Sequence, residues 1–206
     1  MSATPDNGLG LPVMETFLTI QGEGFHTGRS AWFIRLGGCE VGCTWCDVKE
    51  SWDASAHPLR TVTELVSEAS ASTTRFVVIT GGEPAMYDLG PLTRSFHEAG
   101  FTIAIETSGA YPLKGEFDWV CVSPKKFKSP LPEMLYLADE LKVVVYHPSD
   151  FDWAESHKTH CKASCQFYLQ PEHSRFDERI GAIIDYVKGH SEWRISLQTH
   201  KFLNIP

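Results

Sequence analysis

The sequence has no apolar run approaching the ~20 residues that cross a bilayer, and no basic-then-apolar start typical of a secretory signal. Basic residues are in the minority, with 18 Lys and Arg against 26 Asp and Glu, and the net charge of −8 argues against general nucleic-acid binding. We therefore expect no nucleic-acid or membrane partner and a cytoplasmic location. Internal repeats and linkers are also lacking, so we expect a single domain over residues 1–206, with 1–12 as a flexible N-terminal tail.

Short β-branched runs alternate with amphipathic segments along the chain. The first helix has the clearest start, because Thr61 and Glu64 have the spacing of a capping box. Strands are predicted at 31–36, 75–80, 101–106, 119–122, 141–146, 166–169 and 194–197, and helices from 61 onward and over 91–99, 132–138 and 176–188. The alternation predicts an α/β fold with a parallel sheet. Fewer than eight units fit into 206 residues, so we expect an incomplete, partly open parallel (β/α) barrel.

Polar residues follow the ends of several predicted strands. They lie at 80–83, 106–108, 123–125, 170–171 and 198–201. The carboxyl ends of parallel barrel strands meet at one rim, where binding sites form. The sequence therefore predicts a site at that rim.

Half of the six cysteines lie close together, with the spacing C-x3-C-x2-C at Cys39, Cys43 and Cys46. In a reducing compartment such a cluster favours metal or redox chemistry over disulfides. Three thiolates on one loop can hold three irons of a 4Fe-4S cluster and leave the fourth iron open. The alternative is a zinc site closed by His57 or Asp47. No second C-x2-C pair is present, which favours the iron–sulfur interpretation. Cys121, Cys161 and Cys165 form no comparable group and are expected to be non-catalytic.

The triplet, with an aromatic residue before its last cysteine, and the GGEP segment at 81–84 resemble the radical S-adenosylmethionine superfamily. The resemblance implies that the amino and carboxylate groups of S-adenosylmethionine chelate the open iron. It also implies that backbone and side chain of the GGEP segment receive the amino group. One electron from the cluster then yields a 5′-deoxyadenosyl radical, so the cofactor supplies the reactive chemistry and no catalytic side chain is assigned.

Further segments resemble the 7-carboxy-7-deazaguanine synthase family, except in the N-terminal tail and near 147–164. They are FLTIQGEGFHTGRSAWFIRLGGC, VVITGGEP, ETSG, VSPK, ELKVVV, FYLQP and SLQTHKFLNIP. This resemblance implies a lyase that contracts the ring of 6-carboxy-5,6,7,8-tetrahydropterin to 7-carboxy-7-deazaguanine and releases ammonia, in queuosine biosynthesis. The radical would take a hydrogen from C6 of the pterin. The alternatives are a radical-generating activase of another enzyme and a non-catalytic metal-binding module.

The resemblance also implies a set of substrate-binding residues. They are Ile20, Gln21, Gly22, Glu23, Arg35, Thr80 and Pro206. Arg35 ends a predicted strand where an apolar residue is expected, and its fork suits a substrate carboxylate. The alternative is a surface arginine paired with a nearby acid. Glu23 is a candidate for acid–base chemistry or pterin binding. The carboxylate of Pro206 is expected in the pterin site, the alternative being a frayed terminus.

The cofactor-binding residues implied in the same way lie in three segments. They are Gly82, Ser123, Pro124, Lys125, Gln170, Pro171, Glu172 and His173. The family also implies Mg²⁺, held by a Ser or Thr where this chain has Val48. Because Mg²⁺ prefers oxygen ligands, the ion would bind through substrate and water, or Asp47 would reach it. An electron donor such as flavodoxin or ferredoxin and a homodimer are the partners that the resemblance implies.

Overall fold

The computed structural model describes residues 10–206, which form one nine-stranded sheet with the order β3-β1-β2-β4-β5-β6-β7-β8-β9. From β2 to β9 every neighbouring pair is parallel, whereas β1 is antiparallel to both β2 and β3. Within the described residues the edge strands β3 and β9 do not pair with each other. The prediction of an incomplete, partly open parallel barrel is therefore confirmed.

All seven predicted strands are present, with ends that differ from the prediction by at most two residues. They are β2 (Ser30–Leu36), β4 (Phe76–Gly81), β5 (Thr102–Thr107), β6 (Trp119–Val122), β7 (Glu140–Val145), β8 (Gln166–Pro171) and β9 (Trp193–Ile195). Two strands were not predicted: β1 (Gly10–Ile20) and β3 (Leu59–Thr61). A register shift between Val13 and Glu15 breaks the alternation in β1, which hides the strand pattern. The expected tail over 1–12 is therefore wrong for 10–12, and residues 1–9 lie outside the described residues.

The four predicted helices are confirmed. They are α1 (Val62–Ser70), α2 (Gly90–Glu98), α3 (Pro132–Leu137) and α5 (Phe176–Gly189). Thr61 and Glu64 form the predicted capping box, in which the Thr61 N–H donates to Glu64 Oε2 over 2.7 Å. Two further helices, α4 (Asp150–Lys158) and α6 (Thr199–Leu203), were not predicted. α4 occupies much of the segment near 147–164, which the resemblance to the synthase family did not cover.

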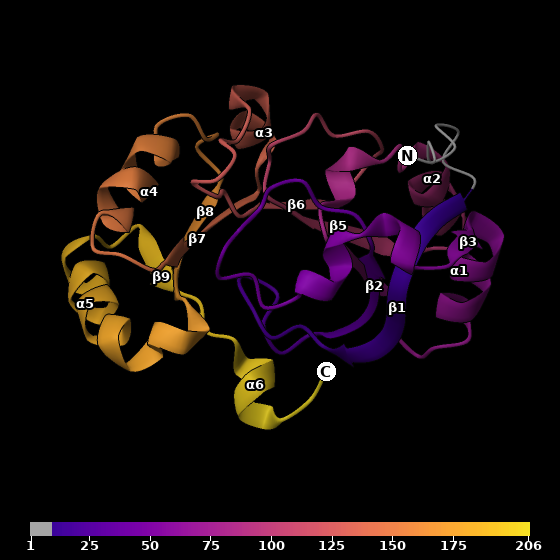
Figure 1. Ribbon diagram of the computed structural model, residues 1–206, viewed down its shortest axis with the longest axis horizontal. Helices are drawn as coiled ribbons and strands as arrows, with labels where there is room; N and C mark the ends of the chain where they lie inside the picture. The colour runs from indigo at the N-terminus through magenta and orange to yellow at the C-terminus, as the bar shows by residue number, and fades with distance from the viewer. Residues whose placement is uncertain (1–9) are drawn as a thin grey trace.

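The helices α1 to α5 lie on the outside of the curved sheet, as Figure 1 shows. The core fills the space between helices and sheet, where Leu65, Leu92 and Ile183 from the helices join Ile79 and Val143 from the sheet in one buried cluster. The opposite, inner face of the sheet is apolar near the amino ends of the strands, where a small cluster forms. Its members are Ala31, Phe76, Val78 and Ala104. Towards the carboxyl ends of the strands the inner face becomes polar, and the candidate site lies at this polar end.

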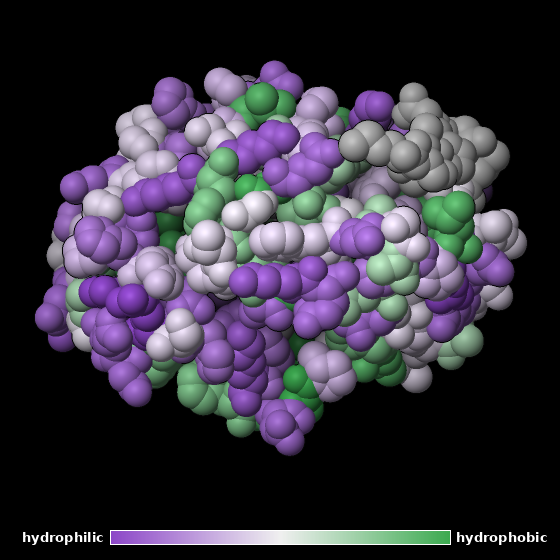
Figure 2. Space-filling view, in the orientation of Figure 1, coloured by the Kyte–Doolittle hydropathy of each residue, from purple (hydrophilic) through white to green (hydrophobic). Residues whose placement is uncertain are grey.

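The face shown in Figure 2 is largely hydrophilic, with apolar residues scattered over it. Among residues 10–206, no helix has both the length and the apolar character that a membrane crossing requires.

Candidate active site

A cavity of about 460 Å³ opens at the carboxyl ends of the parallel strands, as expected for this architecture. The cysteine triplet lines it, together with almost every residue that the sequence predicted. The lining includes Ile20, Gln21, Gly22, Glu23, Arg35, Thr80, Gly82, Ser123, Lys125, Gln170, Pro171, Glu172, His173 and Pro206. Of the predicted residues, all within the described part of the chain, Pro124 alone lies outside the lining, buried behind it. The fold thus brings these residues together, and their individual roles stay predictions.

The cysteine loop follows β2 and is joined to the GGEP segment through the backbone. Leu36 O accepts from the Gly82 N–H over 2.8 Å, and Gly38 O accepts from the Glu83 N–H over 2.8 Å. A Cβ at Gly82 would lie 2.2 Å from Gly38 O, a contact that no side chain tolerates. Glycine at 82 is therefore required for the two loops to meet, and any shift of one loop moves the other.

The three thiols are free and line one wall of the cavity. Burial raises the pKa of Cys43 to about 11, Lys125 opposes the shift, and the neighbouring thiols add to it. A bound cation is needed to keep such thiols deprotonated. No three His, Cys, Asp or Glu side chains among residues 10–206 converge to hold a single metal ion. Three soft sulfur donors on one loop, not converging on one point, fit an iron–sulfur cluster better than a mononuclear site.

The two side chains considered as fourth zinc ligands have other partners. His57 Nε2 lies 2.9 Å from Glu50 O, and Asp47 Oδ2 lies 3.0 Å from Lys201 Nζ. Both side chains are thus bonded to other groups of the protein. Neither is therefore favoured as the fourth ligand of a zinc ion.

Glu83 of the GGEP segment is 1% exposed, and its carboxylate accepts hydrogen bonds from the chain itself. The donors are Ala85 N–H at 3.0 Å, Thr107 Oγ1 at 2.5 Å, Ser108 N–H at 2.8 Å and the Ser108 hydroxyl. Four donors fill the acceptor capacity of a carboxylate. The Glu83 side chain is therefore engaged within the protein, and the contact of the GGEP segment with the cofactor amino group stays a prediction.

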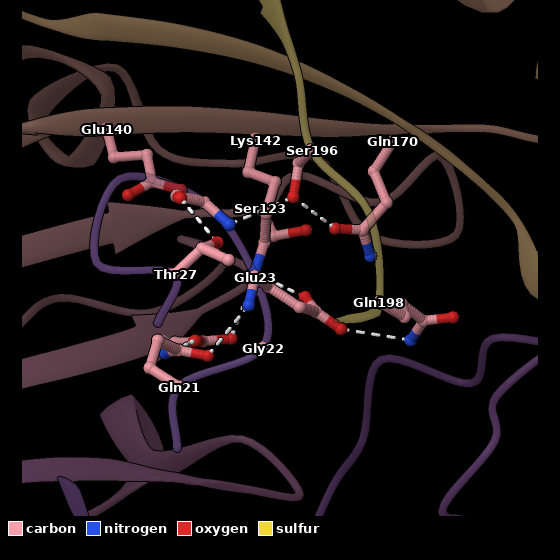
Figure 3. A network of polar contacts seen from close by, with 12 residues as sticks. Gln21, Gly22, Glu23, Thr27, Ser123, Glu140, Lys142, Gln170, Ser196 and Gln198 are labelled. Carbon is pink, nitrogen blue, oxygen red and sulfur yellow. Dashed lines mark hydrogen bonds and ion pairs between the residues drawn. The ribbon is translucent and has the colours of Figure 1, made fainter. Parts of the chain in front are cut away.

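A closed ring of hydrogen bonds lines the cavity, and Figure 3 shows three of its four residues, Gln21, Glu23 and Lys142. Lys142 Nζ lies 2.5 Å from Glu23 Oε2 and 3.1 Å from Glu106 Oε2. Gln21 Nε2 donates to Glu106 Oε1 over 2.8 Å. The Glu23 N–H closes the ring by donating to Gln21 Oε1 over 3.0 Å. We call these four residues the inner ring.

The inner ring holds Glu23 as an anion. Burial alone would raise the pKa of Glu23, but the Lys142 ammonium and hydrogen bonds from Gln198 and Gln170 lower it to about 2. Burial alone would likewise lower the pKa of Lys142, but Glu106 and Glu23 raise it well above its usual value. A carboxyl with so low a pKa is a poor proton acceptor near neutral pH. Of the two roles considered for Glu23, the geometry favours binding over acid–base chemistry.

The peptide groups of the Gln21–Gly22 turn are used inside the protein. The Gln21 N–H donates to Arg29 O over 2.8 Å, and Gly22 O accepts from the Thr199 N–H over 2.9 Å. A Cβ at Gly22 would lie 2.3 Å from His200 Nδ1, so the ring of His200 packs directly on this glycine. The turn therefore anchors α6 to the barrel in addition to lining the cavity.

Arg35 pairs with a nearby acid, as in the alternative interpretation, and it also lines the cavity. Its Nε lies 2.6 Å from Glu15 Oε1, and its guanidinium lies 5.6 Å from the centre of the Phe17 ring. Within residues 10–206 its two Nη groups make no further hydrogen bond, and the side chain lines the cavity. The ion pair with Glu15 thus orients the fork and leaves two parallel donors for a ligand.

The C-terminus returns to the sheet. Figure 1 shows α6 beyond β9 and the chain end beside β1. Thr19 Oγ1 donates to Pro206 O over 3.0 Å, and Pro206 lines the cavity. The expectation of a terminal carboxylate in the site is compatible with this placement, and the frayed terminus is not favoured.

Two lining residues, Lys142 and Trp45, were not predicted as site residues from the sequence. Glu106, Gln198 and Lys201 were predicted only as part of the polar segments at the rim. The signal for Lys142 was present, because Glu140 and Lys142 alternate with apolar residues in the run ELKVVV and therefore share the face of β7 opposite the core. Gln198 and Lys201 lie in the polar segment 198–201, whose individual roles were not predictable from its position after a strand.

Comparison with known proteins gives the same picture. The sequence profile of the Radical SAM superfamily matches residues 33–135. The chain is 49% identical to a 7-carboxy-7-deazaguanine synthase of Flavobacterium psychrophilum over 98% of this chain and 95% of the relative. It is 50% identical to the synthase of Synechocystis sp. over 94% and 93%. The crystal structure of QueE from Escherichia coli superposes with a TM-score of 0.82 and 33% identity, covering 91% of this chain and 93% of that one. With the cysteine triplet, the GGEP loop and the inner ring in one cavity, the chain belongs to the 7-carboxy-7-deazaguanine synthase family of the Radical SAM superfamily.

Proposed function

We propose that this chain contracts the ring of 6-carboxy-5,6,7,8-tetrahydropterin to 7-carboxy-7-deazaguanine and releases ammonia, a carbon–nitrogen lyase reaction in the biosynthesis of queuosine and related 7-deazapurines. The observation that carries the proposal is the shared cavity, in which the cysteine triplet faces polar groups suited to a pterin. Relatives of this name that match nearly the whole chain support it over a radical-generating activase or a non-catalytic module.

The Radical SAM superfamily uses a 4Fe-4S cluster and S-adenosylmethionine, and Cys39, Cys43 and Cys46 would hold the cluster. When bound, this pair supplies a 5′-deoxyadenosyl radical. Residues beside the triplet have groups for the rest of the cofactor: the backbone at Gly82, and Lys125 with its Nζ 2.6 Å from Ser123 Oγ. The stretch from Gln170 to His173 lines the same region of the cavity.

The substrate would be held by complementary charges. The free Nη groups of Arg35 suit its carboxylate, whereas the oxygens of Glu106 and Pro206 suit the N–H groups of its amino-pyrimidinone edge. Glu106 retains acceptor capacity, because each of its oxygens accepts one hydrogen bond in the inner ring. Orientation by several fixed groups is how a protein directs a radical to one hydrogen of its substrate.

The test is anaerobic reconstitution with iron and sulfide, followed by addition of S-adenosylmethionine, a reductant and the carboxytetrahydropterin. We expect 5′-deoxyadenosine and a product with the mass of 7-carboxy-7-deazaguanine. A glycyl radical on an added protein, without that product, would favour an activase. A colourless protein with stoichiometric zinc would favour the non-catalytic module.

Among residues 10–206, the Mg²⁺ that the resemblance implies finds no complete set of side-chain ligands. Val48 offers no oxygen, and Asp47 Oδ2 is within 3.0 Å of Lys201 Nζ and 3.4 Å of Gln198 Nε2. The residues present do not fit the ion, so we assign it no step. We expect activity to fall less than about twofold when divalent ions are chelated, because no side chain of the protein binds the ion.

The matched variant for this prediction is Val48→Thr, which restores a hydroxyl at the same position. It is expected to become stimulated by added Mg²⁺, measured as product formed with and without chelator. A tenfold loss on chelation of the unmodified chain, reversed by Mg²⁺, would contradict the prediction.

Extending the C-terminus by one alanine is expected to raise the KM for the pterin about tenfold or more, because the terminal carboxylate and its charge-assisted hydrogen bonds are lost from the cavity. Steady-state kinetics against pterin and against S-adenosylmethionine measure it. A control extension at the N-terminus leaves both KM values unchanged. Equal pterin KM values for the extended and original chains would exclude a role for the Pro206 carboxylate.

The proposed partners are a small electron donor, such as flavodoxin or ferredoxin, and a second copy of the chain. The first follows from the need for one electron per radical. The apolar side chains of Phe202 and Leu203, 63% and 59% exposed on α6, support the homodimer. The cytoplasmic location and the single domain over 1–206 stay predictions from the sequence.

A further inference from the structure

The ammonium of Lys142 is the most deeply buried positive charge of the cavity, with 2% of the residue exposed. On either side along β7, Leu141 and Val143 are fully buried in the core, whereas Lys142 points to the inner face. Burying an ammonium costs several kcal/mol unless it is paired and hydrogen-bonded. A methionine would fill the same volume without that cost, so stability gives no reason for a charge here.

The partners of Lys142 come from two different parts of the fold. Glu23 belongs to the turn after β1 and Glu106 to β5, and both carboxylates line the cavity. Their side chains are 15% and 21% exposed, so both retain contact with the cavity. Without a cation between them the two carboxylates would repel each other, and a shared low-dielectric site would favour protonation of one of them.

The rest of the inner ring depends on the same cation. Gln21 donates to Glu106 and accepts from the Glu23 N–H, so the orientation of its amide follows from the position of both carboxylates. Gln198 donates to Glu23 Oε1 over 2.9 Å, which links the ring to the segment that leads to the C-terminus. One buried ammonium thus fixes two carboxylates and, through them, the amide of Gln21.

We propose that Lys142 is a positioning residue for the pterin: it holds Glu23 and Glu106 ionised and in fixed places, so that the cavity wall presents hydrogen-bond acceptors to the N–H groups of a 2-amino-4-oxo heterocycle. This inference rests on the proposed function, since it assigns the recognition of that substrate. Ligands that offer acceptors where the pterin offers N–H groups are rejected by the same anionic wall.

Other titratable groups face the inner ring and enter its pH dependence. They are Glu140 on the same strand, Cys121 on β6, Lys125 after β6 and His200 on α6. Burial raises the pKa of Glu140, whose Oε2 accepts from the Phe25 N–H at 3.1 Å and Trp119 Nε1 at 3.1 Å. Burial also raises the pKa of Cys121 well above its usual value. Lys142 is the cation that contacts both carboxylates directly.

The first test is Lys142→Met, measured with the cluster-loaded enzyme. We expect the KM for the carboxytetrahydropterin to rise at least about thirtyfold, the effect of removing one partner of a buried charge pair. The dissociation constant of S-adenosylmethionine and the iron content stay as in the unmodified enzyme. The matched control is Lys162→Met, which removes the ammonium paired with Asp139 at 2.5 Å outside the cavity and leaves both constants unchanged.

The pH profile separates positioning from a merely structural role. In the unmodified enzyme the pKa of Glu23 is about 2. Glu23 therefore stays ionised between pH 5 and 8, since even pH 5 is ~3 units above that pKa, and it causes no decline of kcat/KM on the acid side of this range. In Lys142→Met, burial remains and the ammonium is lost, so the pKa of Glu23 rises above its ordinary value. Its carboxylate then protonates as the pH falls, and kcat/KM declines on the acid side of that range.

A second variant distinguishes a loss of substrate positioning from misfolding. Lys142→Met with Glu23→Gln removes both charges of the closest pair, and we expect it to unfold at a temperature close to that of the unmodified enzyme while the pterin KM stays high. Either variant with a pterin KM within twofold of the unmodified enzyme would overturn the inference. So would a rise in the S-adenosylmethionine dissociation constant parallel to the pterin KM.

Failure of the proposed function has a different signature. The unmodified enzyme would then form no deazaguanine, whatever happens at Lys142. Anaerobic calorimetric binding of the carboxytetrahydropterin still compares the variants in that case. Equal affinity of the unmodified and Lys142→Met proteins overturns the inference, and weaker binding by the variant alone supports it.

Discussion

Replacing Cys43 with serine is expected to abolish product formation and cluster loading together. A hydroxyl does not replace a soft thiolate as an iron ligand, and the loop supplies only three sulfurs to begin with. The measurement is iron and sulfide per chain after reconstitution, followed by assays for 5′-deoxyadenosine and deazaguanine. We expect both assays to fall to background while the unfolding temperature of the metal-free chain changes little.

Cys161→Ser is the matched control, because Cys161 is a half-buried free thiol outside the cavity. It is expected to bind as much iron as the unmodified chain and to keep its activity. Iron binding that survives in Cys43→Ser, or that is lost in Cys161→Ser, would place the cluster on a different set of cysteines.

Arg35→Met is expected to raise the KM for the pterin about a hundredfold, since two charge-assisted hydrogen bonds to the substrate carboxylate are lost. Arg35→Lys restores the charge without the fork, and we expect it to recover only part of the loss. Kinetics with the carboxytetrahydropterin measure both variants, and the affinity for S-adenosylmethionine is expected to stay unchanged.

Arg60→Met provides a close comparison. Arg60 forms a similar ion pair, with Nη1 2.8 Å from Glu68 Oε2, and it lies outside the cavity. Loss of that pair is expected to leave the pterin KM unaltered. If Arg60→Met and Arg35→Met raised the KM equally, the effect of Arg35 would be one of stability, and its assignment to the substrate carboxylate would be wrong.

The antiparallel strand β1 shows why part of the fold was not predictable. The segment Gly10–Ile20 contains Gly, Pro and a register shift, so its burial does not alternate regularly. Its strand character is imposed by pairing with β2 along most of its length. The helix α4 was missed for a related reason, because only Asp150 and Ala154 are buried in it and it has no continuous apolar face.

The inner ring shows why part of the site was not predictable. Its contacts join residues separated by 36, 85 and 119 positions along the chain. Glu23 and Gln21 were predicted from the motif of their own segment, but nothing in that segment indicates that Lys142 is their partner. The low pKa of Glu23 follows from this contact, and so does the preference for binding over acid–base chemistry.

The sequence by itself determined the chemistry that depends on short spacing: three cysteines within eight positions, the GGEP turn, the capping box of α1 and the period of the parallel strands. These features lie within single segments, where local geometry decides what neighbouring residues do. The tertiary structure alone decided which charges meet. It placed Lys142 between Glu23 and Glu106. It also surrounded the carboxylate of Glu83 with hydrogen-bond donors of the protein and paired Asp47 with Lys201. Such pairings depend on how distant segments pack in a low-dielectric interior, and no local pattern encodes that packing.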